Sequence, residues 1–135
     1  MVLVDTSAWV EFLRATGSPV HRHIRGELKR RAPLATTDVV VMEVLAGAKD
    51  PGHLQTLRRL LTGCHLLPVH GLADFEDAAA LYRSCRTQGV TIRRLTDCLI
   101  AAVAVRSGVP LLHADRDFDL IARCTPLQIA PPGPT

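Results

Sequence analysis

Short apolar segments alternate with longer segments of helical periodicity along the whole chain of 135 residues. Strands of a parallel sheet that is covered on both faces are short and continuously apolar, and a helix joins each strand to the next. The crossovers between such strands are right-handed. The alternation therefore predicts an α/β fold with a central parallel sheet flanked by helices on both faces. The segments predicted as extended are residues 2–4, 33–36, 65–69, 109–115 (which ends in a turn) and 126–130.

Capping residues and the spacing of apolar side chains indicate where the helices begin and end. Ser7 is placed to cap the first helix, and Pro19 suits the first turn of an amphipathic second helix. Gly89 and Gly108 stand where helix C-termini favour glycine. The segments predicted as helices are residues 7–14, 19–30, 38–47, 51–63, 72–89, 95–108 and 117–124.

The length and composition indicate one globular domain, residues 1–130, followed by a flexible proline-rich tail, residues 131–135. Hydrophobic residues make up 47% of the chain and charged residues 21%, which excludes a disordered chain. No apolar run approaches the ~18 residues that span a bilayer, and the N-terminus lacks the order of a signal peptide. We therefore expect a cytoplasmic protein.

The four cysteines are widely spaced and form no C-x-x-C pair. In a cytoplasmic protein this spacing favours small core residues over disulfides or metal ligands. The residues concerned are Cys64, Cys85, Cys98 and Cys124.

A formal net charge of +3 is too small to indicate nucleic-acid binding on its own. Basic residues are nevertheless concentrated in and just after the second predicted helix. Two interpretations of this cluster stay open, a solvated helix face or a surface that receives RNA or a protein partner. Its members are His21, Arg22, His23, Arg25, Lys29, Arg30 and Arg31.

Carboxylates follow two of the predicted strands. Asp5 comes directly after residues 2–4, and Asp115 and Asp117 come at the end of "VPLLHAD" and just beyond it. In open α/β sheets, sites form beyond the carboxyl ends of the strands, so these two loops are expected to share one rim. Taken alone, Asp115 and Asp117 are ordinary turn and cap residues. Asp5 is harder to explain in this way, because Ser7 is available to cap the helix.

Two further carboxylates lie in apolar helices. Glu43 stands inside "VVVMEVLAG", where a charge must be paired, bound to a metal or turned outward. Asp97 stands at the start of "LTDCLIAAVAV", where free N–H groups and the helix dipole stabilise a carboxylate. Each has an ordinary explanation on its own, as a solvent-facing acid or a first-turn acid. Only together with the strand-end acids do they indicate a site.

Carboxylates gathered at one rim repel one another and must share protons or be neutralised by cations. Ligands that are all oxygen favour hard ions such as Mg²⁺ or Mn²⁺ over zinc. Because Mg²⁺ keeps several waters and binds few carboxylates, its natural substrate is a phosphate. A zinc site around His113, Asp115 and Asp117 lacks further His or Cys partners. The chain has no P-loop, G-x-G-x-x-G or G-x-S-x-G motif, which argues against nucleotide cofactors and serine hydrolysis.

Four segments, in order, resemble the acidic motifs of PIN-domain ribonucleases. They are "VLVDTSAWVEF", the glutamate of "VVMEVLAGA", "LTDCLIAAVA" and "PLLHADRDFD". Each motif is weak alone, but four in order, with matching spacing over essentially the whole chain, are specific. Within the family, the chain is most similar to the short single-domain toxins of bacterial VapBC toxin–antitoxin pairs.

The resemblance implies an endoribonuclease that depends on Mg²⁺ or Mn²⁺ and cuts structured RNA, most often tRNA, to inhibit translation. It also implies a homodimer that is silenced by a small antitoxin protein. Asp5, Glu43, Asp97 and Asp115 match the family's four acidic positions, which carry catalysis and bind metal. Asp117 matches an additional metal-binding acid.

Hydroxyl and basic residues near these acids are given supporting roles. Ser7 matches the family's hydroxyl two residues beyond the first acid and would orient Asp5 or a water, with Thr6 beside it. The candidates to grip the RNA backbone are Arg93, Arg94 and Arg116, although surface solubility explains them equally well.

Three alternatives to this interpretation stay open. An aspartyl phosphotransferase also has an Asp after its first strand, but it favours a second Asp where this chain has Ser7. A non-catalytic PIN-like or receiver-like module would bind a cation with the same acids. A DNA-directed nuclease of the same fold is not distinguished, because the acids say nothing about the 2′-hydroxyl.

Overall fold

Short parallel strands form a four-stranded sheet in the order β3-β2-β1-β4. The computed structural model describes residues 1–132. Leu3 in β1 pairs with Ala35 in β2 on one side and with Leu111 in β4 on the other, so β1 is central. The strands are β1 (Val2–Val4), β2 (Leu34–Thr36), β3 (His65–Leu66) and β4 (Leu111–Leu112).

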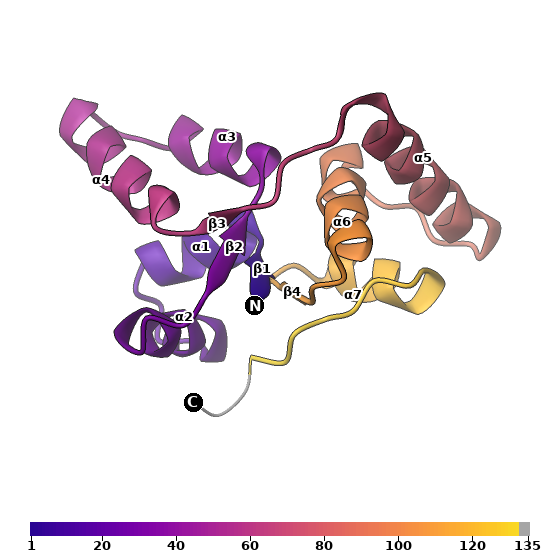
Figure 1. Cartoon of the computed structure of the whole chain (residues 1–135). Helices are drawn as coiled ribbons and strands as arrows, with labels where there is room; N and C mark the ends of the chain where they lie inside the picture. The colour runs from indigo at the N-terminus through magenta and orange to yellow at the C-terminus, as the bar shows by residue number, and fades with distance from the viewer. Residues whose placement is uncertain (133–135) are drawn as a thin grey trace.

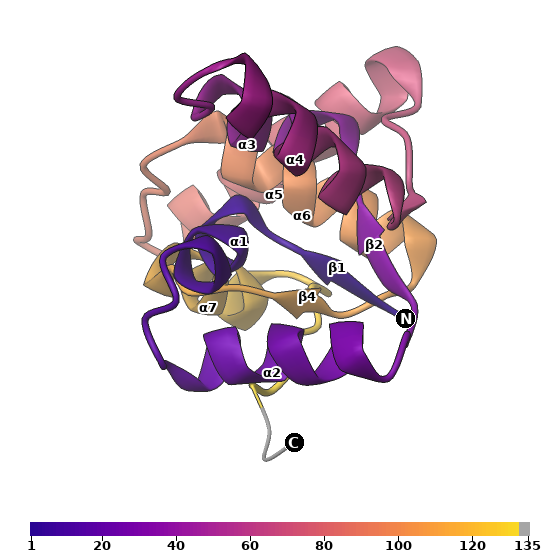
Figure 2. The ribbon, with the colours of Figure 1, turned by 90° about the vertical axis from the view of Figure 1, so that its left-hand side faces the viewer.

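Helices cover this sheet on both faces, and the predicted α/β architecture is confirmed. Figures 1 and 2 show α1, α2 and α4 on one side of the strands and α5, α6 and α7 on the other. Every predicted helix is present, with both ends within two residues of the prediction. The bounds are α1 (Thr6–Leu13), α2 (Pro19–Lys29), α3 (Asp38–Ala46), α4 (Pro51–Thr62), α5 (Gly71–Thr87), α6 (Leu95–Ser107) and α7 (Arg116–Cys124).

Three local predictions are wrong. The strand predicted at residues 126–130 is a single bridge between Leu111 and Ile129. In the segment 65–69 the strand is limited to His65–Leu66, and the last backbone hydrogen bond to β2 is from Leu67 N to Thr36 O (2.7 Å). Proline explains both, because Pro126 and Pro68 have no N–H to extend a ladder. The cap of α1 is Asp5 instead of Ser7. Of the predicted flexible tail, residues 133–135 lie outside the described residues.

Helix α6 is buried almost all round because it lies between the sheet and α5 (Figure 1). Every side chain from Cys98 to Ala104 is buried, and Cys85 on α5 is buried as well. These two cysteines are core residues, as predicted. Among residues 1–132, no helix has the length and apolar character needed to cross a membrane. The tight packing of α6 fixes its first turn, which carries Asp97.

A buried ion pair joins α5 to α6. Asp74 is fully buried, and Arg106 donates to it from Nε and Nη2, each 2.9 Å from a carboxylate oxygen. Arg106 Nη2 also donates to the carbonyl of Pro68 (2.8 Å). The guanidinium holds the pKa of the Asp74 carboxyl below its usual value. The pair therefore links the first turn of α5 to the last turn of α6.

We expect Arg106→Met to lower the free energy of unfolding by about 3 kcal/mol at neutral pH, because it leaves the Asp74 carboxylate buried and unpaired. Urea denaturation followed by circular dichroism measures the change. The control is Arg83→Met, which removes an exposed arginine from α5 and is expected to change this free energy by less than about 0.5 kcal/mol. Equal losses in the two variants would contradict the role given to the pair.

Candidate active site

The site lies where the carboxyl ends of β1 and β4 meet. These strands are neighbours, yet the loop after β1 leads to α1 on one side of the sheet and the loop after β4 leads to α7 on the other (Figure 1). Open α/β sheets bind ligands at such switch points. The residues directly beyond the strands are Asp5 and the turn from His113 to Asp115.

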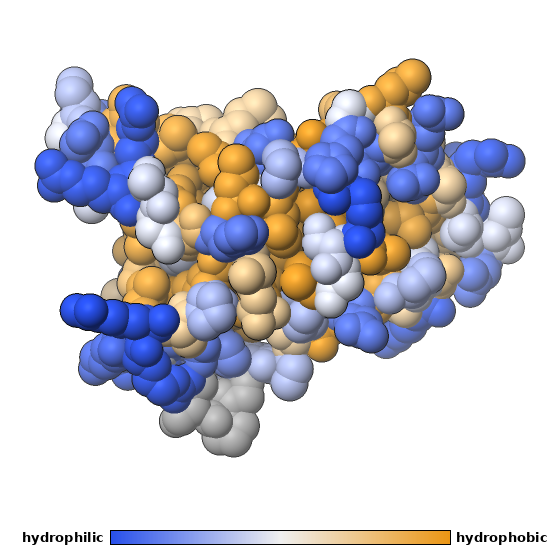
Figure 3. Space-filling view, in the orientation of Figure 1, coloured by the Kyte–Doolittle hydropathy of each residue, from blue (hydrophilic) through white to orange (hydrophobic). Residues whose placement is uncertain are grey.

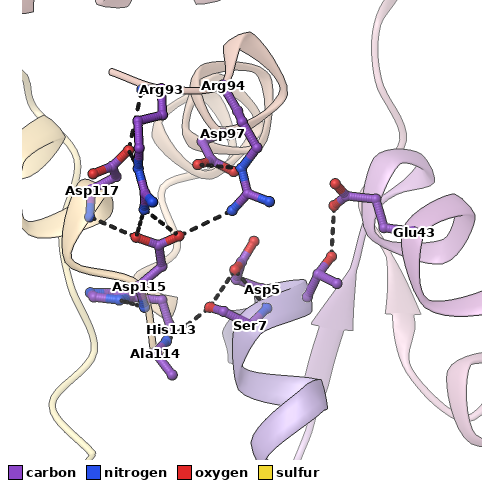
Figure 4. Close-up of polar contacts among 11 residues, drawn as sticks. Asp5, Ser7, Glu43, Arg93, Arg94, Asp97, His113, Ala114, Asp115 and Asp117 are labelled. Carbon is purple, nitrogen blue, oxygen red and sulfur yellow. Dashed lines mark hydrogen bonds and ion pairs between the residues drawn. The ribbon is translucent and has the colours of Figure 1, made fainter. Parts of the chain in front are cut away.

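Asp5 is held in place by Ser7. As the N-cap of α1, Asp5 accepts hydrogen bonds at Oδ2 from Ser7 N (2.8 Å) and Ser7 Oγ (2.6 Å). Ser7 Oγ accepts a hydrogen bond from Ala114 N (2.9 Å), which ties the end of β1 to the end of β4 (Figure 4). Burial raises the pKa of Asp5 above its usual value, against the Ser7 hydrogen bonds. The predicted orienting contact between Ser7 and Asp5 is present.

Thr6 positions Glu43 from the neighbouring helix. Its Oγ1 donates to Glu43 Oε1 (2.7 Å), which links α1 to α3 beside the site. Carboxylates that are far apart in the sequence consequently face one cavity of about 270 Å³. The cavity is lined by Asp5, Thr6, Ser7, Val10, Glu11, Glu43, Arg94, Asp97 and Ala114.

Asp97 is a buried carboxylate with an unsatisfied oxygen. It lies in the first turn of α6 and is only 2% exposed. Its Oδ2 is 3.5 Å from Arg94 Nε, an ion-pair distance, but accepts no hydrogen bond. Burial raises the pKa of Asp97 to about 6; Arg94 opposes this shift, and the nearby carboxylates add to it. An oxygen in this state is suited to receive a cation.

Two arginines neutralise the acids on the β4 side of the site. Arg94 Nη2 lies 3.0 Å from Asp115 Oδ2, so this side chain bridges Asp115 and Asp97. Arg93 lies 3.0 Å from Asp115 through Nη2 and 3.0 Å from Asp117 through Nε. Figure 4 shows both guanidinium groups between the carboxylates. Because more than half of each arginine side chain is exposed, each pair contributes little stability by itself.

Asp115 is oriented by the turn that starts α7. It is the N-cap of α7, and its Oδ1 accepts a hydrogen bond from Asp117 N (3.0 Å). The backbone N–H of Asp115 donates to His113 Nδ1 (3.0 Å), and His113 Nε2 lies 3.0 Å from Asp119 Oδ1. His113 therefore stabilises the turn that starts α7. The capping hydrogen bond directs the Asp115 carboxylate toward the two arginines.

The donor set fits a hard divalent cation. The carboxylates that face the cavity offer only oxygen ligands, and the buried Oδ2 of Asp97 lacks a hydrogen-bond donor. Within residues 1–132, no three His, Cys, Asp or Glu side chains are arranged closely enough to share an ion.

The structure brings most of the predicted site residues together. Asp115 lies next to the cavity, across Arg94 from Asp97. Asp117 is directed at Arg93 and does not line the cavity, and Arg116 is exposed. The roles of the acids as ligands, and of the arginines toward RNA, stay predictions. The predicted residues that line the cavity are Asp5, Thr6, Ser7, Glu43, Asp97 and Arg94.

Glu11 lines the cavity but was not singled out from the sequence. It stands four residues after Ser7, and residues at this spacing share one face of a helix. This spacing is sufficient to place Glu11 on the same face of α1 as Ser7. The ion pairs of Arg93 with Asp115 and Asp117 had no such signal, because the partners are more than 20 residues apart.

We expect Asp97→Asn to stabilise the protein in EDTA near neutral pH. Because the folded state raises the pKa of Asp97 from 3.8 to about 6, ionising this group costs stability as the pH rises through that range. The variant avoids the cost, roughly 2 kcal/mol at neutral pH. Urea denaturation over a pH series measures the difference, which should vanish in acid. Asp77→Asn, at an exposed position, is the control, and a wild-type-like pH dependence in Asp97→Asn would contradict the prediction.

Comparison with known proteins identifies the family to which this acidic α/β domain belongs. The sequence model of the PIN-domain family matches residues 2–123, so the chain belongs to this family. It is 47% identical over 131 residues to Ribonuclease VapC11 of Mycobacterium tuberculosis, an alignment that covers 96% of this chain and 98% of the relative. Ribonuclease VapC51 of the same organism is 30% identical over 134 residues, with 97% and 94% covered. The predicted resemblance to PIN-domain proteins of the VapC type is confirmed.

Solved structures agree with this assignment. A toxin–antitoxin complex from Klebsiella pneumoniae contains a chain that is 25% identical, with a TM-score of 0.68 and coverage of 96% of this chain and 100% of that chain. VapBC2 from Rickettsia felis, bound to a DNA fragment from its promoter, superposes with a TM-score of 0.74 at 17% identity, covering 96% and 98%. The second likeness establishes the fold alone.

Proposed function

We propose that this protein is a metal-dependent endoribonuclease toxin that cleaves structured RNA, with tRNA as its substrate, and so inhibits translation. The observation that carries the proposal is the cavity shared by Asp5, Glu43 and Asp97, with Ser7 fixing Asp5. The identity of 47% to a VapC ribonuclease supports the same activity. A tRNA substrate implies action in the cytoplasm.

The cation is Mg²⁺ or Mn²⁺, as the all-oxygen donor set favours. Asp5, Glu43, Asp97 and Asp115 would hold it, with Asp117 as a further acid beside Arg93. When bound, such a cation supplies an acidified water as nucleophile and stabilises charge on the attacking and leaving oxygens of the phosphodiester.

The protein's own residues orient the acids and meet the substrate. Ser7 and Thr6 each fix one carboxylate, Asp5 and Glu43, by a hydrogen bond from a hydroxyl. Arg94 lines the cavity, and with Arg93 it offers guanidinium groups to a phosphodiester that enters the site. Arg116 lies at the start of α7 and is exposed, so it would contact RNA further from the cut bond.

At the acidic cavity, recognition of the RNA relies on shape and phosphate contacts. Trp9 is fully buried, and Tyr82 is partly buried on α5, away from the cavity. The lining of the acidic cavity includes no aromatic side chain on which an unpaired base could stack. This supports a structured target in preference to a single strand.

We further propose that the protein forms a homodimer and is silenced by a small antitoxin. Its similarity to chains in toxin–antitoxin complexes supports the antitoxin. Apolar side chains gather over the middle of one face, between α4 and α5 (Figure 3). Beside β3, the side chains of Val41, Leu45, Leu54 and Leu66 line a hollow of about 550 Å³, which offers a surface for protein contact.

Cleavage of a total small-RNA pool by purified, antitoxin-free protein tests the activity. With Mg²⁺ or Mn²⁺ we expect discrete fragments, and in EDTA none. Asp5→Asn removes a ligand and should lower the rate at least about a hundredfold. Ser7→Ala loosens that ligand and should lower it about tenfold. Asp77→Asn should leave it unchanged.

Other outcomes of this assay would select an alternative. A folded, metal-loaded protein that cuts neither RNA nor DNA is a cation-binding module. A protein that cuts DNA and leaves RNA intact is a DNA-directed nuclease of the same fold. Gel electrophoresis of both substrates, followed by sequencing of fragment ends, distinguishes these results.

We expect Arg94→Gln to bind Mn²⁺ more tightly than the wild type, by about fivefold or roughly 1 kcal/mol. The reason is that Arg94 competes with a cation for Asp97 and Asp115. Isothermal titration calorimetry measures the affinity, and Arg116→Gln removes an exposed arginine nearby as the control. Weaker Mn²⁺ binding by Arg94→Gln would mean that the arginine orders the ligands instead of competing.

A further inference from the structure

A second cavity, of about 300 Å³, adjoins the acidic one. The two cavities share three wall residues, Thr6, Val10 and Glu43, so they are neighbouring parts of one depression. The second cavity lies between α1 and the pair α3–α4, which Figure 2 shows above α1. A molecule bound in the acidic cavity therefore lies next to the second one.

The second cavity combines an apolar floor with basic groups. Its lining includes Val10, Leu13, Val44 and Leu57 as apolar residues, Arg14, Lys49 and His53 as basic residues, and the shared Glu43 as the one acid. Arg14 and Lys49 are exposed, and within residues 1–132 neither forms an ion pair. Their charge is therefore available to an anion that enters from solvent.

His53 is fixed so that one ring nitrogen is left to donate. The backbone N–H of Lys49 donates to His53 Nδ1 (3.0 Å), and Asp50 Oδ1 accepts a hydrogen bond from His53 N (2.7 Å). With Nδ1 acting as an acceptor, the proton of the neutral ring is on Nε2. The turn that starts α4 thus presents a cation, Lys49, and an N–H donor, His53, to the same cavity.

We infer that the second cavity binds the nucleotide next to the phosphate that is cut, a role that rests on the proposed ribonuclease function. The nucleobase lies against the apolar floor, and Arg14, Lys49 and His53 bind the flanking phosphate. Because the carboxylates of the acidic cavity repel a polyanion, the cationic side chains of the second cavity add to Arg93 and Arg94 in holding the strand. The volume is at the lower end of small-molecule sites, which suits one nucleotide.

Binding of a tRNA pool to full-length protein that carries Asp5→Asn tests this inference without cleavage. Adding Arg14→Gln and Lys49→Gln together should weaken binding about tenfold and reduce the slope of log affinity against log salt by about 1.5 to 2. Arg83→Gln, at an exposed position on α5, is the matched control and should change binding less than twofold. Unchanged affinity in the Arg14 and Lys49 double substitution would overturn the inference.

Leu13→Ser separates the base contact from the phosphate contact. Leu13 is 42% exposed, so the fold tolerates the change. We expect binding to weaken about threefold with the salt slope unchanged, since a base contact releases no counterion. In the cleaving protein, Arg14→Gln with Lys49→Gln should raise KM and leave kcat within about threefold. A loss in kcat alone would contradict a binding role.

Two controls separate this inference from the function on which it rests. If the protein with Asp5→Asn binds tRNA but the unsubstituted protein does not cut it, the proposed ribonuclease function fails, whatever the cavity binds. If RNA binding is insensitive to Arg14 and Lys49 while binding of poly-L-glutamate depends on them, the cavity receives an acidic peptide. That result overturns the nucleotide assignment and leaves the ribonuclease proposal intact.

Discussion

The burial of carboxylates around one cavity is the constraint on which this structure depends. Asp5, Glu43 and Asp97 face this cavity, where burial first and the neighbouring carboxylates second raise the pKa values of Asp5 and Asp97. A fold selected for stability alone would place apolar residues at these positions, because buried like charges oppose folding. The rigid β1–β4 junction and the tightly packed α6 supply the stability that lets the acids remain together.

The protein offsets this unfavourable charge with its own cations. Arg94 bridges Asp97 and Asp115, and Arg93 bridges Asp115 and Asp117. Both side chains are more than half exposed, so their ion pairs with the carboxylates are weak. Another cation can therefore replace the arginines at these carboxylates. The same guanidinium groups, once released, are within reach of a phosphate. Neutralising the acids and, in the proposed function, binding the substrate phosphate would then be two uses of the same pair.

The sequence was sufficient to predict the α/β architecture, every helix and three of the four acids that line the cavity, because strand ends and apolar periodicity are local signals. Local signals also explain the errors. Aspartate and serine are about equally good N-caps, so nothing in "VDTS" distinguished Asp5 from Ser7 as the cap of α1. The pairing of Arg93 with Asp117 depends on tertiary structure, as does the approach of Arg14 to Lys49 across one cavity. No spacing in the sequence encodes either contact.

The bond from Ala114 N to Ser7 Oγ joins residues that are 107 positions apart. Since the same hydroxyl donates to Asp5, a displacement of the β4–α7 turn is transmitted to the first carboxylate through two short links. A change in the position of this turn therefore changes the position of Asp5. Residue 114 is therefore coupled to the first carboxylate by two hydrogen bonds, although almost the whole chain separates the two residues in sequence.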